Sequence, residues 1–359
     1  MDLLKKTISH IEAVDKSWMQ KAKRRQDSLV KPPGSLGFLE ELSIRLAGIY
    51  RDEKVALNKK MMLTFGADHG VYEEGISIQP QSITADHFAS YSTGKCTIGL
   101  MAKYLNLDIV AVDVGIKCDH DIPGVLNKKI RKATSNMAKG AAMSREEAVL
   151  SIERGIALTQ EYIDRGYEIF GIGEMGICNT TPSSAMLAVL EGLDVEQVTG
   201  LGAGTLPSNL NHKVEVIQRS IDLNNPDPKD PIDVLAKVGG FEIGAMAGVI
   251  LGCSANRIPV VLDGFISNIS ALLATKLAPL SKDYMIGSHL SDEPGARYAL
   301  KTLGLPSPLN MNMRLGEGSG GAMMFPIIDM ALYLYDRMPT FSENEIPDFD
   351  QLTPPDIED

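Results

Sequence analysis

Residues 167–182 read Tyr-Glu-Ile-Phe-Gly-Ile-Gly-Glu-Met-Gly-Ile-Cys-Asn-Thr-Thr-Pro, and this stretch decides the fold. It begins as a short apolar strand, passes through a glycine-rich turn, and reaches Thr181, which can cap a helix that begins at Pro182. A strand, a glycine turn and a helix N-terminus together form a natural anion site, because exposed N–H groups and the helix dipole both favour a phosphate there.

The same alternation of short strands and helices continues along most of the chain. One helical segment opens on the capping box Ser144-x-x-Glu147 and closes at Gly166. The expected strands are short runs of apolar or β-branched residues: 61–65, 107–114, 167–172, 197–201, 258–262 and 283–286. Strands that are apolar on both faces and separated by helices predict an α/β fold with a mostly parallel sheet and helices on both faces.

The N-terminal segment, 2–52, has a helical pattern of leucine and isoleucine and predicts two helices. They are interrupted at Lys31-Pro-Pro-Gly-Ser-Leu-Gly37. A plain turn in which Ser35 caps the second helix is the favoured interpretation of this break, ahead of direct contact with a ligand.

Length and charge restrict the class of protein. The chain has 359 residues, which predicts one large core with a subdomain or two domains. Its formal charge is −11, but the segment after Arg337 contributes seven acids and no Lys or Arg, which leaves about −4 for the remainder. The acids are Glu343, Glu345, Asp348, Asp350, Asp356, Glu358 and Asp359. An acidic chain without a basic stripe excludes nucleic acid as the main partner and lacks the charge that binds anionic membranes.

The cysteines and the uncharged runs indicate a cytoplasmic protein. Cys96, Cys118, Cys178 and Cys253 are scattered without zinc-ligand spacing, so reduced thiols are expected. The charged N-terminus does not resemble a signal peptide, and the longest uncharged run, 175–190, is shorter and more polar than a membrane span of ~20 apolar residues.

Further glycine turns at 200–205, 263–264 and 316–321 are expected at the C-terminal edge of the sheet, where open α/β folds bind ligands. None matches the dinucleotide or P-loop fingerprints, which disfavours an NAD(P) oxidoreductase or an ATP site. In the last turn Glu317 stands among glycines, where it can act as a base; the alternative is a glycine turn with a solvated carboxylate.

Several other residues have two interpretations. Asp68-His69 is either a carboxylate–imidazole pair or a turn that ends a strand, and neither a metal site nor a Ser-His-Asp hydrolase has support. Lys213 either folds back on a bound anion or is an exposed helix lysine. Asp263 and Asn268 either bind ribose hydroxyls or cap a turn. These residues support a phosphate-bearing, nucleotide-like ligand without naming a reaction.

Six motifs in order resemble the family of nicotinate mononucleotide:5,6-dimethylbenzimidazole phosphoribosyltransferases. They are residues 31–37, 67–71, 173–182 (Gly-Glu-Met-Gly and Asn-Thr-Thr-Pro), 237–241, 262–265 and 313–320. The resemblance implies a Rossmann-like α/β domain over 56–319, a small helical domain built from 1–55 with 320–345, and a homodimer. It implies no metal and no organic cofactor. The run of acids marks 346–359 as an acidic tail.

The resemblance also implies an activity and a site. Family members displace nicotinate from nicotinate mononucleotide by a benzimidazole nitrogen, with inversion at the anomeric carbon, and form an α-ribazole 5′-phosphate for the lower ligand of cobamides. Glu317 matches the family's general base. The implied substrate-binding residues are Glu174, Met175, Gly176, Ile177, Gly202, Ala203, Gly204, Lys213, Asp263, Leu315, Gly316 and Gly318.

One segment departs from the family pattern. Family members place a serine and a glutamine near the benzimidazole edge, where this chain carries Gln79 and His87, with Ile83 between them. These larger or titratable groups lead us to hypothesise that the accepted base is other than, or broader than, dimethylbenzimidazole. A rival from another class is a non-catalytic nucleotide sensor that uses the same glycine loops.

Overall fold

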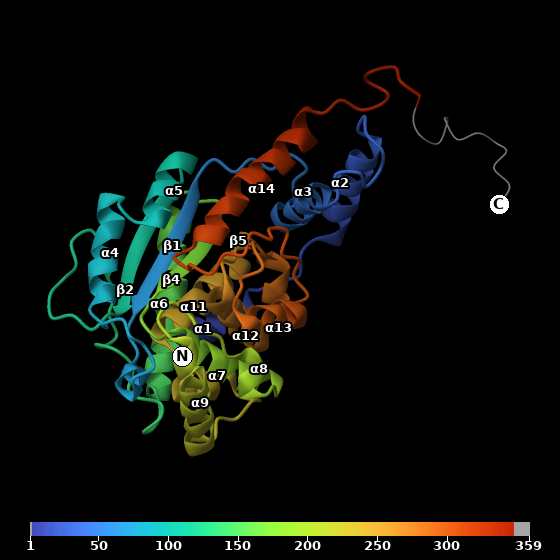
Figure 1. Cartoon of the computed structure of the whole chain (residues 1–359). Helices are drawn as coiled ribbons and strands as arrows, with labels where there is room; N and C mark the ends of the chain where they lie inside the picture. The colour runs from blue at the N-terminus through green and yellow to red at the C-terminus, as the bar shows by residue number, and fades with distance from the viewer. Residues whose placement is uncertain (1, 348–359) are drawn as a thin grey trace. The chain divides into compact units, whose positions relative to one another are not determined.

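The structure is a computed structural model that describes residues 2–347, and it confirms the α/β fold with a parallel sheet (Figure 1). The six strands are β1 (Lys60–Ala67), β2 (Asp108–Gly115), β3 (Leu126–Asn127), β4 (Ile169–Met175), β5 (Val260–Val261) and β6 (Met285–Ile286). Their order is β3-β2-β1-β4-β5-β6, and every neighbouring pair is parallel. This is the strand order of a doubly wound nucleotide-binding fold, whose ligand crevice opens where the order reverses, between β1 and β4.

Five of the six expected strands are confirmed, and the prediction for 197–201 is wrong. There the chain forms a short helix, α8 (Val195–Val198), followed by a loop. The helical turn is stabilised by side chains that bond to main-chain carbonyls: Thr199 Oγ1 donates to Val195 O and Ser184 Oγ donates to Val198 O. The two-residue strand β3 was not expected, because a pair of residues carries no periodicity.

The helices of the large unit cover both faces of the sheet. They are α1 (Asp2–Ser9), α4 (Ile83–Thr93), α5 (Thr97–Leu105), α6 (Arg145–Asp164), α7 (Thr180–Glu191), α8, α9 (Leu210–Asn224), α10 (Pro231–Val238), α11 (Phe241–Ala255), α12 (Phe265–Leu277) and α13 (Pro294–Leu303). Short 3-10 turns lie at η1 (Gly70–Glu74), η2 (Pro207–Asn209) and η3 (Pro279–Tyr284). The predicted capping box of α6, Ser144 with Glu147, is present.

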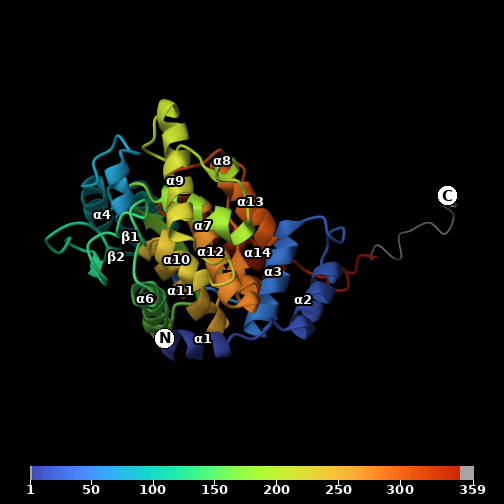
Figure 2. The same cartoon turned by 90° about the horizontal axis from the view of Figure 1, so that it is seen from below.

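Alternation along β1 decides which helix lies on which face. A Cβ at Gly66 would meet Phe88 of α4 at 2.7 Å, so the side chains at even-numbered positions of β1 face α4. A Cβ at Gly115, beside Ala67, would meet Phe241 of α11 at 2.6 Å, so the odd positions face α11. The helix α6 packs along α11 in a second layer, and α1 lies beside both (Figure 2).

The described residues form two compact units: 2–12 with 58–324, and 13–57 with 325–347. The smaller unit contains α2 (Lys16–Ser28), α3 (Phe38–Tyr50) and the later part of α14 (Ser319–Arg337). Three N-terminal helices are present where two were expected, because Asp15 caps α2 by accepting bonds from the amides of Ser17 and Trp18. The first of the three, α1, lies in the larger unit.

The turn at 31–37 also differs from the expectation. Ser35 lies inside the turn, and α3 begins at Phe38 after Gly37, which has φ 52° and makes no side-chain cap. Lys31 is buried and pairs with Glu40 at 2.7 Å, so this segment is held internally. The domain limits drawn from the sequence stay a prediction, and most of the expected acidic tail, 348–359, lies outside the described residues. No helix within 2–347 is long and apolar enough to cross a membrane.

Candidate functional site

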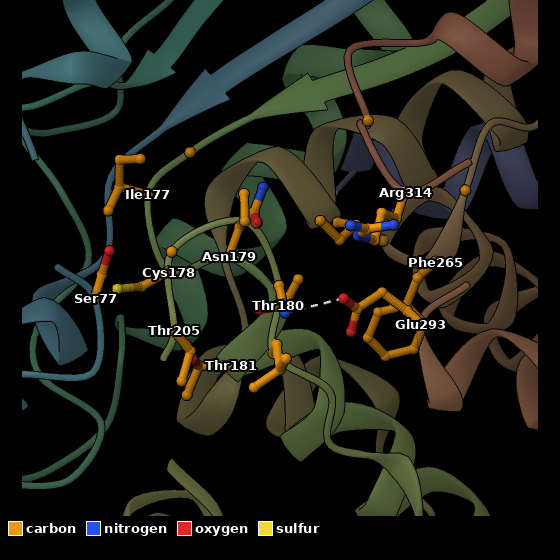
Figure 3. A pocket seen from close by; sticks show the side chains of 18 of the residues that line it. Ser77, Ile177, Cys178, Asn179, Thr180, Thr181, Thr205, Phe265, Glu293 and Arg314 are labelled. Carbon is orange, nitrogen blue, oxygen red and sulfur yellow. Dashed lines mark hydrogen bonds between the residues drawn. The ribbon is translucent and has the colours of Figure 1, made fainter. Parts of the chain in front are cut away.

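A cavity of about 100 Å³ lies at the carboxyl ends of the strands, next to the point where the strand order reverses. In Figure 3, Asn179, Thr180 and Thr181 border it between Ser77 on one side and Glu293 with Phe265 on the other. Its lining includes most of the substrate-binding residues expected from the sequence: Glu174, Met175, Gly176, Ile177, Gly202, Ala203, Gly204, Lys213, Leu315 and Gly316.

The turn between β4 and α7 carries a buried acid. Glu174 accepts a short hydrogen bond from Asn179, and burial raises its pKa well above the usual value, with further raising by the carboxylates of Asp263 and Glu242. The turn is tight because Gly176 packs against the carbonyl of Ala67, where a Cβ has no room. The helix begins at Thr180, after Asn179, so the predicted Thr181 cap is wrong.

Lys213 is a buried cation of α9, and the exposed-lysine interpretation is therefore wrong. Its ammonium donates to Thr180 Oγ1 at 2.8 Å and to Gly200 O at 2.7 Å. Burial lowers its pKa to about 8, although Glu293 acts in the opposite direction. A lysine held in this way supplies a positive point charge to the cavity that it lines.

The glycine turn at 200–204 is already partly engaged by other protein groups. The amide of Gly202 donates to Glu293 Oε1 at 2.9 Å, and the carbonyl of Gly204 accepts from the amide of Ile78 at 3.0 Å. The second oxygen of Glu293 is buried without a hydrogen-bond partner in the described structure. The amide of Gly202, which the sequence analysis assigned to the ligand, therefore donates its hydrogen bond to the carboxylate of Glu293 instead.

Asp263 binds main chain and does not line the cavity. Its Oδ2 accepts from the amide of Gly318 at 3.0 Å, and its Oδ1 accepts from the amides of Gly320 at 2.7 Å and Gly321 at 3.1 Å. Burial raises the pKa of Asp263, while the nearby His289 and these amides act against that rise. The capping interpretation thus describes what the carboxylate does here, and a ribose contact stays a prediction.

Asn268, the other residue considered for ribose, is buried in α12. Its side-chain oxygen and nitrogen have no hydrogen-bond partner among the described residues, and it does not line the cavity.

Glu317 lies in a strained loop at the start of α14. Three successive residues have positive φ: Gly316 at 88°, Glu317 at 64° and Gly318 at 91°. A non-glycine residue in this region is uncommon and is maintained only by surrounding contacts. Here the amide of Glu317 donates to Glu174 O at 3.1 Å, and its carbonyl lies 3.4 Å from Thr64 Oγ1.

The carboxylate of Glu317 has two donors and the residue is 4% exposed, so the solvated-turn interpretation is wrong. Oε1 lies 2.7 Å from His87 Nε2, and Oε2 accepts from the amide of Ile98 at 3.3 Å. Ile98 belongs to the first turn of α5, whose dipole favours an anion.

The three residues expected to contact the base separate in the structure. Gln79 lines the cavity, whereas Ile83 and His87 do not. Ile83 opens α4, and His87 follows one turn later on the same helix, where it contacts Glu317. The structure thus connects His87 directly to the expected general base.

Asp68 and His69 form two separate contacts and not a pair. Asp68 accepts from Thr84 Oγ1 and from the amide of Lys117, and Thr84 Oγ1 in turn accepts from the amide of Ile177. His69 Nε2 lies 3.0 Å from the buried Glu242 without hydrogen-bond geometry. Burial lowers the pKa of His69, but the carboxylates of Glu242 and Asp68 together outweigh burial, so the net shift is upward.

The structure places Ser291 and Glu293 around the cavity, and the sequence indicated neither; Thr180 and Arg314, which also line it, lay in quoted motifs without an assigned role. The segment 291–294, Ser-Asp-Glu-Pro, was readable as a helix start with proline at its first position, but nothing in it indicated a ligand site. Within 2–347, no group of three or more His, Cys, Asp or Glu side chains is placed to hold a metal ion.

Comparison with known proteins gives the family. Residues 11–346 match a family model described as Phosphoribosyltransferase. A nicotinate-nucleotide–dimethylbenzimidazole phosphoribosyltransferase of Clostridioides difficile is 53% identical over 96% of this chain and 99% of its own length. The enzyme of that name from Desulforamulus reducens is 48% identical over 96% of this chain and 98% of its own length.

Solved structures agree with the sequence relatives. A crystal structure of the nicotinate-nucleotide–dimethylbenzimidazole phosphoribosyltransferase of Thermus thermophilus has a TM-score of 0.87 and 36% identity, and the match covers 93% of this chain and 99% of that one. On this family model, these relatives and this fold, the chain belongs to the nicotinate-nucleotide–dimethylbenzimidazole phosphoribosyltransferase family.

Proposed function

We propose that this protein transfers the phosphoribosyl group of nicotinate mononucleotide to 5,6-dimethylbenzimidazole or a related base, and releases nicotinate and an α-ribazole 5′-phosphate. The names of the relatives in the family support this assignment. The structural observation that carries it is a single cavity lined both by the buried cation Lys213 and by Leu315 and Gly316, which lead directly into the buried carboxylate of Glu317.

The cavity offers one place for the phosphate of the substrate. Lys213 supplies a positive charge, and the segments 175–177 and 202–204 supply main chain beside the N-terminus of α7. Because Glu293 holds the amide of Gly202, we infer that the phosphate either displaces this carboxylate or binds beside it. The ribose would then extend toward Glu174 and Gly316, which lie on the same cavity.

The chemistry requires a base and little acid. When an azole nitrogen attacks the anomeric carbon from the α face, the bond to the pyridinium nitrogen breaks, and its electron pair neutralises that ring. The attacking azole becomes positively charged and must lose the proton on its other nitrogen. We assign this proton to the carboxylate of Glu317, which is buried, ionisable and placed by donors on two helices, α4 and α5.

Precise placement supplies the rest of the rate enhancement. The loop from 313 to 318 is held by Asp263, by the carbonyl of Glu174 and by the amide of Ile98. A base fixed in this way loses little freedom when the azole binds, so most of the ordering cost is met during folding.

Incubation with nicotinate mononucleotide and dimethylbenzimidazole tests the proposal. Release of nicotinate, measured by chromatography, and an α-anomeric product, identified by NMR, are expected. Glu317→Gln should bind the mononucleotide with unchanged affinity and lose turnover; a Glu317→Gln enzyme with full turnover would remove the role of base. Binding of the mononucleotide without any nicotinate release would instead favour the non-catalytic sensor.

The preferred base needs its own experiment. Gln79 lines the cavity, and a Cβ on Gly204 would lie 3.6 Å from its Oε1, so a large polar side chain borders the glycine turn there. Competition among benzimidazoles, purines and phenols is expected to show a preference other than or broader than dimethylbenzimidazole. An exclusive preference for dimethylbenzimidazole would contradict the hypothesis.

We also propose a homodimer, on the family resemblance and on one exposed apolar surface. Leu100 and Tyr104 lie one turn apart on α5 and are 60% and 90% exposed, which is unusual for large apolar side chains that form a pair. Tyr104→Glu is expected to shift the protein toward the monomer in analytical ultracentrifugation, with Tyr333→Glu in the smaller unit as a control. A cytoplasmic location stays a prediction from the sequence.

A further inference from the structure

Glu317, the proposed general base, has one contact that differs in kind from its others. His87 Nε2 lies 2.7 Å from Glu317 Oε1, and the imidazole is 29% exposed while the carboxyl is 5% exposed. Every other group that holds Glu317 is main chain or is buried: the amide of Ile98, the carbonyl of Glu174 and the hydroxyl of Thr64. His87 is therefore the partner of the base that is both titratable and reached by solvent.

The charge of the imidazole changes what this contact does. A neutral imidazole donates its single N–H to Oε1 and leaves further lone pairs of the carboxylate free for the proton of the azole. An imidazolium forms a charge-assisted bond that is roughly twice as strong. Its positive charge also reduces the tendency of the carboxylate to accept the proton of the azole. An unperturbed imidazole changes charge between about pH 5 and 8, so the experiment that tests this contact spans that range.

We propose that His87 is a positioning residue of the phosphoribosyl transfer: neutral, it orients the Glu317 carboxylate toward the incoming azole, and protonated, it holds the carboxylate in an ion pair that the azole must disrupt. This inference rests on the proposed function and adds to it a residue that acts through the base. It also gives a physical role to one of the two positions at which the chain departs from its family pattern.

The other ionisable groups near His87 do not change charge in the same way. The ring of Tyr91, one turn along α4, meets the imidazole edge-on at 5.5 Å, and Cys96 caps the start of α5. Burial raises the pKa of Tyr91 and of Cys96, and the carboxylate of Glu317 adds to both shifts, so each stays neutral around pH 7.

More distant charges are common to every variant of His87. Glu174 and Asp263 act on the same region through their charges, and Asp86 and Lys95 are exposed neighbours along the chain. A difference in pH dependence between enzymes that differ only at residue 87 therefore reports the imidazole.

Two substitutions separate position from charge. His87→Gln keeps an N–H donor but never carries a charge, whereas His87→Leu keeps bulk and removes the donor. The matched control is His10→Gln, which removes an exposed histidine whose ring contacts the Lys6 carbonyl after α1. The measurement is kcat/KM for dimethylbenzimidazole at saturating nicotinate mononucleotide, from pH 5.5 to 8.5, with circular dichroism to verify folding.

At pH 8 we expect His87→Gln to remain within about threefold of the unmodified enzyme, and His87→Leu to lose roughly 10- to 100-fold, the equivalent of one hydrogen bond to a charged group. Between pH 7.5 and 5.5 the ratio of His87→Gln to the unmodified enzyme should rise roughly tenfold, because only the unmodified enzyme acquires the imidazolium. Titration of the free azole is the same for both enzymes and cancels in this ratio.

A pH-independent ratio for His87→Gln would overturn the proposal, as would a fully active His87→Leu. If His87→Leu does not fold, the pH ratio of His87→Gln decides alone. If the unmodified enzyme releases no nicotinate with any azole, the proposed function has failed, which is a different outcome from active enzymes whose pH profiles coincide.

Discussion

The side chain of Asp263 is expected to hold the catalytic loop, and its removal should separate stability from chemistry. The carboxylate accepts hydrogen bonds from three donors at the start of α14, the amides of Gly318, Gly320 and Gly321, at 2.7 to 3.1 Å. Asp263→Ala removes all three bonds at once and leaves a space in which the loop that carries Glu317 can move.

The magnitude follows from the number of donors. Each buried donor that loses its acceptor costs about 1–3 kcal/mol, which gives an upper range near 9 kcal/mol for three. Two effects reduce this figure: water can enter beside the shortened side chain, and Asp263→Ala removes a carboxylate whose raised pKa shows that its burial as an anion is costly. We therefore expect a loss of roughly 3–5 kcal/mol, the usual cost of breaking a buried charged contact.

Urea unfolding followed by circular dichroism measures this loss, and hydrogen exchange on the segment 313–325 locates it. The matched control is Asp230→Ala at the start of α10, because Asp230 also accepts from two helix amides but is partly exposed. There the cost should be ~0.5–2 kcal/mol. An Asp263→Ala enzyme within ~1 kcal/mol of the unmodified protein, with full turnover and unchanged exchange, would refute the reasoning.

Three further substitutions test the cavity. Because burial lowers the pKa of Lys213 to about 8, kcat/KM for nicotinate mononucleotide should fall as pH rises through 8, and Lys213→Arg, which stays charged, should lack this decline in a stopped assay of nicotinate. The pKa of Glu174 is raised in the folded state, so the stability of the unmodified protein should decrease as pH rises above the pKa of an unfolded glutamate. The free energy of unfolding of Glu174→Gln in urea, relative to that of the unmodified protein, should therefore grow between pH 5 and 8. A Cβ at Gly173 would lie 2.6 Å from the carbonyl carbon and oxygen of Glu317. Gly173→Ala should therefore cost ~1–3 kcal/mol in urea unfolding and lower turnover by roughly 100-fold, because it displaces the base. Gly140→Ala, at a position where space is open, should have neither effect.

The parts of the fold that were predictable from the sequence are those with a long local pattern. The strand that becomes β4 and the capping box of α6 are confirmed because hydrophobic period and cap residues act within one segment. The segment 197–201 was mistaken for a strand because its helical turn depends on Ser184, which lies 14 positions from Val198, and a short sequence window does not contain that contact.

The same limit applies to the site. Lys213 and Glu317 were both candidates, but their burial comes from α7 and α5, which the sequence does not place beside them. The two interpretations of Asp263 also needed the structure, because the amides that it caps lie 55 to 58 positions away. Residue type and spacing indicated the candidates, and long-range contacts decided what each one does.

The partners of four buried acids, Glu174, Glu242, Asp263 and Glu317, explain why Glu317 in particular suits the role of base. Burial, together with the carboxylates of Asp263 and Glu242, raises the pKa of Glu174, and one of its oxygens accepts a hydrogen bond from Asn179. Both oxygens of Asp263 are taken by amides, and Glu242 is fully buried beside His69. Only Glu317, among these four, combines donors that offset the cost of burial with a partner, His87, that solvent reaches. The assignment of the base to Glu317 therefore follows from the partners of each carboxylate. It predicts that an acid placed elsewhere in the cavity will not take over the role of base.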